Sequence, residues 1–220
     1  MGDGPTHSTL QRALDIRVAS AERWLPRDGY RSLNLGVLPA LIPTTSILDW
    51  KVDGSLTALV MIQLLLEPYP VDPFVVYAAF FENGDCFDFL LSPYREYQPQ
   101  HLLAMIRDQN TRKLISALLA FTSAQTFTTE EVAKDPLLSR AVAWYPLSNL
   151  HKPRDAEEHK TLMGLLLCDV LVGHPTPWDL RQFKAFATGL RLGICGVDDI
   201  VKVYGLLCSR WILGLTTALL

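Results

Sequence analysis

Residues 74–91 read FVVYAAFFENGDCFDFLL, and this stretch decides how the rest of the chain is interpreted. At its centre, Asn83 and Gly84 form the dipeptide favoured by a two-residue type I′ turn, because both central positions of that turn need a positive φ. With this turn, Phe80 faces Phe87, and every side chain on their side of the ribbon is apolar. We therefore predict a β-hairpin over residues 74–91, which must pack on helices or join a larger sheet because an isolated hairpin is marginal in water.

The chain before this hairpin alternates helical and strand-like patterns. Apolar residues at helical spacing predict a helix over residues 9–24, and period-two alternation predicts strands near residues 33–37 and 48–52. The Asp53-Gly54 dipeptide predicts a turn, after which residues 56–66 are apolar nearly all round and predict a buried helix.

The chain after the hairpin carries helix signals only. Thr128 with Glu131, and Asp155 with Glu158, have the spacing of a capping box, in which each side chain binds the other residue's backbone N–H. Thr-Pro-Trp-Asp at residues 176–179 predicts a further helix start, with the helix closing at a glycine, residue 189.

The periodicity changes near residue 95 from mixed to helical. We predict an α+β protein with an N-terminal β-hairpin or small antiparallel sheet with helices, followed by a mostly α-helical C-terminal half. Residues 1–95 would form an α+β subdomain that contains the hairpin, and residues 96–220 a helical subdomain, or the two would share one continuous core.

Composition and charge narrow the class of protein. The 220 residues are 49% hydrophobic and carry a net charge of −3 without a long basic run, which argues against an extended nucleic-acid footprint. The four cysteines are widely spaced and form no Cys-x-x-Cys pair, so neither a zinc site nor a disulfide framework is indicated. This usage favours a reducing, cytoplasmic compartment, and the N-terminus shows no secretory signal pattern. No cofactor or metal is predicted.

One cysteine has neighbours that suit a nucleophile. Cys195 lies in the sequence GICG at residues 193–196, just before a predicted helix start, where small neighbours and a helix N-terminus favour a reactive thiolate. The base would be His174 or His159, brought near by folding. A cysteine-dependent hydrolase or transferase is therefore one alternative function.

The last residues, 200–220, are apolar apart from Lys202 and Arg210. A bilayer-spanning helix needs about 20 apolar residues, and Arg210 would fall near its centre, so we expect a core helix, an interface or a membrane-surface helix instead. The side chains predicted to bind a partner are Val203, Leu206, Leu207, Trp211, Leu215 and Leu219.

The function that these patterns favour is a non-catalytic assembly or adaptor protein that associates with itself or with a partner protein. A viral structural or accessory role fits the same patterns. The alternatives are the Cys195 enzyme and a peripheral membrane protein that uses the apolar terminal segment.

Overall fold

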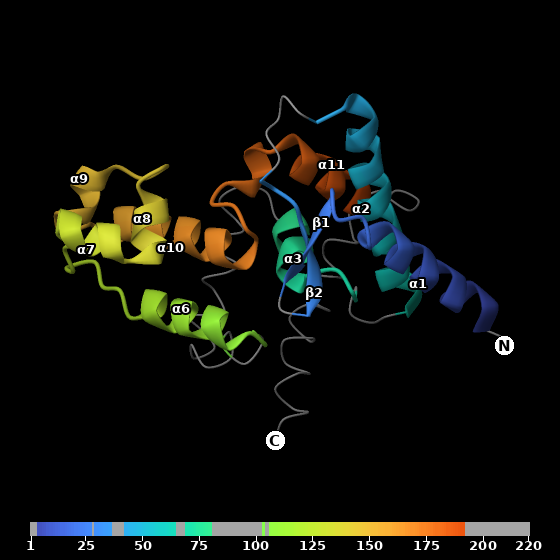
Figure 1. The fold of residues 1–220 in the computed structure, drawn as a ribbon, viewed down its shortest axis with the longest axis horizontal. Helices are drawn as coiled ribbons and strands as arrows, with labels where there is room; N and C mark the ends of the chain where they lie inside the picture. The colour runs from blue at the N-terminus through green and yellow to red at the C-terminus, as the bar shows by residue number, and fades with distance from the viewer. Residues whose placement is uncertain are drawn as a thin grey trace, which may run out of the picture. The chain divides into compact units, whose positions relative to one another are not determined.

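The computed structural model describes residues 4–27, 29–36, 42–64, 69–80, 103 and 106–191. The chain forms two compact units, shown in Figure 1: unit 1 takes residues 1–86 and 177–220, and unit 2 takes residues 87–176. A two-stranded antiparallel sheet lies near the N-terminus and the later half is mostly helical, so the predicted α+β class is confirmed.

Unit 1 surrounds its small sheet with helices. The hairpin pairs Trp24 with Leu33 and Arg27 with Tyr30, and Gly29 takes a φ of 80° in the connecting turn, where glycine is favoured. The elements are α1 (Gly4–Val18), β1 (Trp24–Arg27), β2 (Tyr30–Leu33), α2 (Thr44–Leu64), α3 (Pro73–Phe80), the 3₁₀ helix η2 (Pro177–Asp179) and α11 (Arg181–Leu190).

The core of unit 1 is built where α11 crosses α2. The two backbones meet at Gly54 and Gly189: a Cβ atom on Gly54 would lie 2.8 Å from the backbone nitrogen of Leu190, and closer still to the Phe186 carbonyl oxygen. Trp178 of η2 adds an indole N–H donated over 2.9 Å to the Ala78 carbonyl of α3. Elements about 100 residues apart in the chain therefore share one core.

The predicted hairpin over residues 74–91 is wrong in its first half, because residues 74–80 belong to α3. The Asp72 side chain accepts a hydrogen bond from the Phe74 N–H at 2.9 Å, and Pro73 occupies the first helical position. The run is apolar throughout, and such a run has no periodicity that separates a strand from a helix. Its buried residues are Val75, Val76, Ala78, Ala79 and Phe80. Residues 81–91 lie outside the described residues.

The predicted strand near residues 48–52 is also wrong, since these residues lie inside α2. Leu48 and Val52, four residues apart, lie on one exposed face of that helix, whereas Trp50 points into the core. The predicted turn at Asp53-Gly54 is helical for tertiary reasons: Asp53 is buried against arginines, and Gly54 admits α11. The predicted helix over residues 56–66 is confirmed as far as Leu64, as the second half of α2.

The first predicted helix and strand have shifted boundaries. The helix predicted over residues 9–24 ends at Val18, and Trp24 instead begins β1. The strand predicted near residues 33–37 lies earlier, as β2, and ends at Leu33.

Unit 2 is a set of short helices arranged along one longer helix. Both predicted capping boxes are present: Thr128 and Glu131 cap α7, and Asp155 and Glu158 cap α10. The elements are α6 (Gln109–Leu119), α7 (Thr129–Lys134), α8 (Pro136–Ala141), α9 (Leu147–Leu150) and α10 (Ala156–Leu171).

The side chain and backbone of Arg154 form hydrogen bonds with the loop that follows α6 in unit 2. Its side chain is 4% exposed, and its guanidinium donates to the carbonyls of Thr122 and Gln125 at 3.0 and 2.8 Å while lying over the Phe127 ring. The backbone N–H of Arg154 donates to the Ser123 carbonyl. One buried cation thus holds the segment after α6 against the loop that leads into α10.

Candidate functional site

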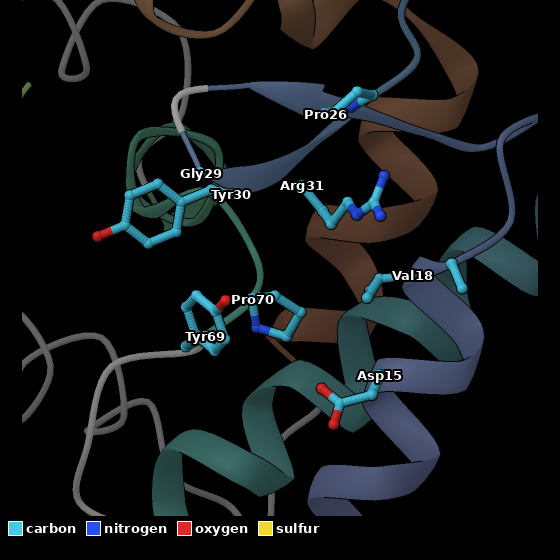
Figure 2. A pocket seen from close by; sticks show the side chains of 9 residues that line it. Asp15, Val18, Pro26, Gly29, Tyr30, Arg31, Tyr69 and Pro70 are labelled. Atoms are coloured by element: carbon cyan, nitrogen blue, oxygen red, sulfur yellow. The ribbon is translucent and has the colours of Figure 1, made fainter. Parts of the chain in front are cut away.

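A pocket of about 520 Å³ opens in unit 1 between the end of α1, the β1–β2 hairpin and the Tyr69-Pro70 segment. Figure 2 shows Tyr30, Tyr69 and Pro70 on one side of it and Val18 of α1 on the other. A volume in this range is typical of small-ligand and side-chain binding sites. The lining side chains used below are Asp15, Pro26, Tyr30, Arg31, Tyr69 and Pro70.

Main-chain hydrogen bonds fix Arg31 and Pro70 side by side. The Arg31 N–H donates to the Pro70 carbonyl at 2.7 Å, and the Asp72 N–H donates to the Arg31 carbonyl at 2.9 Å. Residues 70–72 thus run beside β2 as an isolated parallel bridge between Arg31 and Val71. Because β1 occupies the other edge of β2, both edges of β2 are occupied at Arg31.

Two tyrosine rings form the aromatic wall of the pocket. The centroids of Tyr30 and Tyr69 are 6.1 Å apart with an angle of 66° between the ring planes, which is a favourable edge arrangement. Gln11 of α1 donates to the Tyr69 carbonyl at 2.8 Å, so the segment carrying this ring is tied to α1. Tyr69 is nevertheless 51% exposed, which leaves much of its surface open to a ligand.

The pocket carries one positive and one negative side chain that do not pair with each other. Arg31 is partly buried, and its guanidinium makes no hydrogen bond or ion pair with any residue in the described part of the chain. Asp15 is exposed and accepts a hydrogen bond from Gln11 at 3.0 Å. Both charges are therefore available to a molecule that enters.

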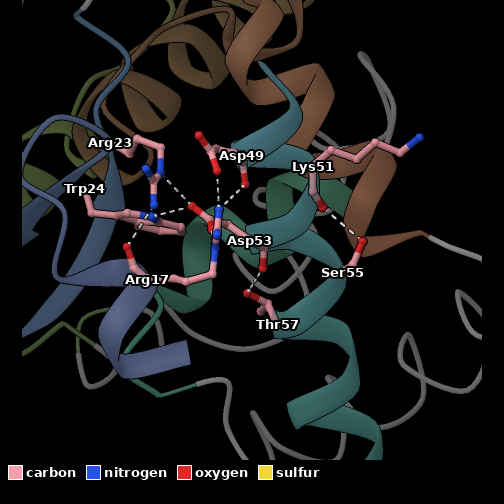
Figure 3. A network of polar contacts seen from close by, with 8 residues as sticks. All are labelled: Arg17, Arg23, Trp24, Asp49, Lys51, Asp53, Ser55 and Thr57. Atoms are coloured by element: carbon pink, nitrogen blue, oxygen red, sulfur yellow. Dashed lines mark hydrogen bonds and ion pairs between the residues drawn. The ribbon is translucent and has the colours of Figure 1, made fainter. Parts of the chain in front are cut away.

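A buried ionic network positions the walls of this pocket (Figure 3). Asp53 of α2 is fully buried and accepts hydrogen bonds from Arg17 at the end of α1, from Arg23 at 3.0 Å and from the Trp24 indole at 3.0 Å. Arg17 also binds Asp49 at 2.8 Å, and that hydrogen bond lowers the pKa of Asp49. One carboxylate thus joins α1, α2 and β1.

The network continues into the core through Trp24. Its ring meets Phe186 of α11 edge to face, with centroids 5.7 Å apart. A buried charge that keeps all its partners holds a fixed geometry, and removing one partner is strongly destabilising. The network therefore connects α1, β1, α2 and α11 beside the pocket.

The site residues predicted from the sequence lie elsewhere. Cys195 is outside the described residues, as are the predicted partner-binding side chains Val203, Leu206, Leu207, Trp211, Leu215 and Leu219. His159 and His174 both belong to unit 2, His159 near the start of α10 and His174 beyond its end. The length of helix between residues 159 and 171 is about 18 Å, so α10 holds the two candidate bases apart.

Each histidine has its own surroundings. Burial lowers the pKa of His159, and the nearby positive charge of Arg154 lowers it further. The Nδ1 atom of His159 is buried without a hydrogen-bond partner in the described part of unit 2. The Nδ1 atom of His174 instead accepts the N–H of Thr176 at 3.1 Å, as in a local turn.

No motif in the sequence singled out the pocket residues Tyr30, Arg31 and Tyr69. The signal that was available is the Asp28-Gly29 dipeptide between two short β-prone runs, which is as strong a hairpin signal as Asn-Gly. No comparable signal places Tyr69 opposite Tyr30, because their approach depends on the tertiary fold.

Comparisons of the chain with protein-family models, with curated proteins and with solved structures find no match. Within the described ranges, no three side chains of the His, Cys, Asp or Glu type gather as a metal site would require. In the same ranges, no helix combines the length and the apolar character needed to cross a bilayer.

Proposed function

We propose that this protein is a non-catalytic adaptor that binds a segment of a partner protein in the pocket of unit 1. The observation that carries the proposal is the combination of two tyrosine rings, two prolines and the Arg31 guanidinium, which has no partner among the described residues, around one pocket of about 520 Å³. Rigid aromatic and proline surfaces provide contact area at low entropic cost, and grooves lined with aromatic rings are a recurring site of peptide recognition.

The backbone around the pocket favours recognition through side chains. At Arg31 both edges of β2 are already occupied, so a peptide cannot add a strand there. In the antiparallel register, the free edge of β1 presents the position of Pro26, which has no N–H to donate. A bound segment would therefore gain its affinity from contacts inside the pocket.

Selection from a random peptide library on the full chain tests this function. Peptides that are retained should bind the Tyr69→Ala variant at least about tenfold more weakly, because truncating an aromatic hot spot costs about 2 kcal/mol or more. Leu147→Ala, which removes an exposed apolar side chain in unit 2, is the matched control and should leave binding unchanged.

Two results would contradict the adaptor function at this site. One is a library that yields no peptide, and the other is a set of peptides whose affinity is the same for wild type and Tyr69→Ala. Since half of the Tyr69 surface is exposed, the variant should fold, and its circular dichroism checks this directly.

The partner-binding role predicted for residues 203–219 belongs to the same proposal. The solution mass of the intact chain, measured by light scattering beside a chain ending at residue 209, tests it. A dimer that becomes a folded monomer on truncation supports an interface on that segment. A monomeric intact chain whose truncated form unfolds contradicts it.

A further inference from the structure

Resting on the adaptor function, we infer that the segment bound in the pocket is a proline-containing acidic peptide. A proline ring would lie against Tyr30 and Tyr69, and a carboxylate a few residues away would bind the Arg31 guanidinium. The aromatic wall of the pocket accounts for the proline, and Arg31 accounts for the carboxylate.

The aromatic wall suits proline. The Tyr30 and Tyr69 rings are inclined by 66° with centroids 6.1 Å apart, so they form two faces of a notch rather than a flat stack. Pro26 and Pro70 add further rigid apolar surface to the lining. A proline-rich segment is already extended before it binds, so it loses little conformational entropy on entering such a notch.

The charge distribution suits a carboxylate at one wall only. Arg31 presents a planar guanidinium whose donors match a carboxylate in a bidentate arrangement. No carboxylate in the described part of the chain pairs with it, and its main chain is held by hydrogen bonds to residues 70–72. Asp15 on the α1 wall repels a second acid, so the acidic residue is directed to the hairpin side.

Three main-chain carbonyls at this pocket are already engaged. The Pro70 and Arg31 carbonyls accept main-chain hydrogen bonds, and the Tyr69 carbonyl accepts one from Gln11. Arg31 is therefore the positively charged side chain of the lining, and its guanidinium N–H groups make no hydrogen bond to the described residues. Specificity for an acidic ligand follows from that single side chain.

Fluorescence anisotropy with the full chain and blocked ten-residue peptides tests the inference. The reference peptide contains two prolines and one glutamate; one comparison peptide has glutamine for the glutamate, and another has alanines for the prolines. We expect each change to weaken binding to the wild type by about tenfold, because charge-assisted hydrogen bonds and aromatic contacts have this magnitude.

Charge reversal gives the sharper result. The Arg31→Gln variant should bind the glutamate and glutamine peptides equally, and Arg31→Glu should prefer a lysine peptide over the glutamate peptide. Arg12→Gln is the matched control, since Arg12 is an exposed arginine of α1 outside the pocket lining, and it should keep the wild-type preference.

The outcomes separate this inference from the adaptor function. Equal binding of the glutamate and glutamine peptides by wild type overturns the acidic preference, and equal binding of the proline and alanine peptides overturns the proline preference. If library peptides depend on Tyr69 but show neither preference, the adaptor function stands and this inference fails. If no library peptide depends on Tyr69, both fail.

Discussion

The crossing of α2 and α11 gives the sharpest test of the fold, through replacement of Gly189 by alanine. A Cβ atom on Gly189 would lie 2.8 Å from the Lys51 carbonyl carbon and 2.9 Å from the Ser55 backbone nitrogen, whereas ordinary van der Waals contact begins near 3.4 Å. Both neighbours are backbone atoms of α2, so no side chain can rotate away. The helices must separate, or the backbone must distort.

The magnitude follows from two opposing effects. To reach ordinary contact distance the two helices must move apart by about half an ångström or more, which loses a quarter to a half of the dispersion energy of each contact between them. Overpacking of this kind costs about 1–3 kcal/mol, occasionally more. Alanine is intrinsically better than glycine in a helix interior by about 1 kcal/mol. We expect a net loss of about 2 kcal/mol, or a fall in Tm of about 4–8 °C.

Urea denaturation followed by tryptophan fluorescence measures this loss, because Trp24, Trp50 and Trp178 all lie in unit 1. Gly36→Ala is the matched control: among the described residues, a Cβ there would meet only the Asn34 side-chain oxygen, at 3.7 Å. That control should change the free energy of unfolding by no more than about 0.5 kcal/mol. Gly54→Ala, on the facing helix, should behave like Gly189→Ala.

A Gly189→Ala protein as stable as the wild type, or more stable, would refute this reasoning. It would mean that helix propensity outweighs the steric contact, and therefore that α2 and α11 do not approach as closely as the structure has them.

Three further changes test the buried polar groups. Asp53→Asn should lower the free energy of unfolding by about 3–5 kcal/mol in urea melts, because the partly buried charge of Arg23 loses its counter-ion and Arg17 keeps only Asp49. An unchanged midpoint would contradict this. Gln182→Met should raise the free energy of unfolding by about 1–2 kcal/mol, because the fully buried amide of Gln182 has no hydrogen-bond partner in the described part of unit 1. A loss of stability would show that the amide does have a hydrogen-bond partner. Since burial lowers the pKa of His159 below 6.5, the unfolded chain binds the proton more readily and stability should fall as pH drops through and below about 6.5. His159→Gln should flatten that slope between pH 8 and 5, and an identical slope in the variant would assign the pH dependence to other groups.

The sequence predicted well the features whose interactions span only a few residues. The capping boxes at Thr128 and Asp155 were predicted correctly because each joins a residue to one three positions away, with no help from the rest of the chain. The α+β class is also confirmed, although residues 74–80 of the hairpin on which it was based form a helix. The sheet itself lies at Trp24–Leu33, around the Asp28-Gly29 signal, and not at the predicted position.

The errors fall where an apolar run or a glycine depends on a distant partner. Residues 74–80 form a helix, and a continuous apolar run carries no period that separates a helix from a strand. Asp53-Gly54 resembles a turn in sequence. In the structure it lies inside α2, where the carboxylate binds Arg17 from 36 residues away and the glycine admits α11 from more than 130 residues away.

By itself, then, the sequence determined the helix caps and the α+β class, both of which depend on neighbouring residues or on residue patterns. The pocket depends on the tertiary structure, because Tyr30 and Tyr69 lie together only when residues 70–72 run beside β2. The tertiary structure also decided that Arg31 remains without a carboxylate partner among the described residues while Arg17 and Arg23 share Asp53. The physical reason is that the pairing of charges and rings depends on distances in space, which local sequence patterns do not encode.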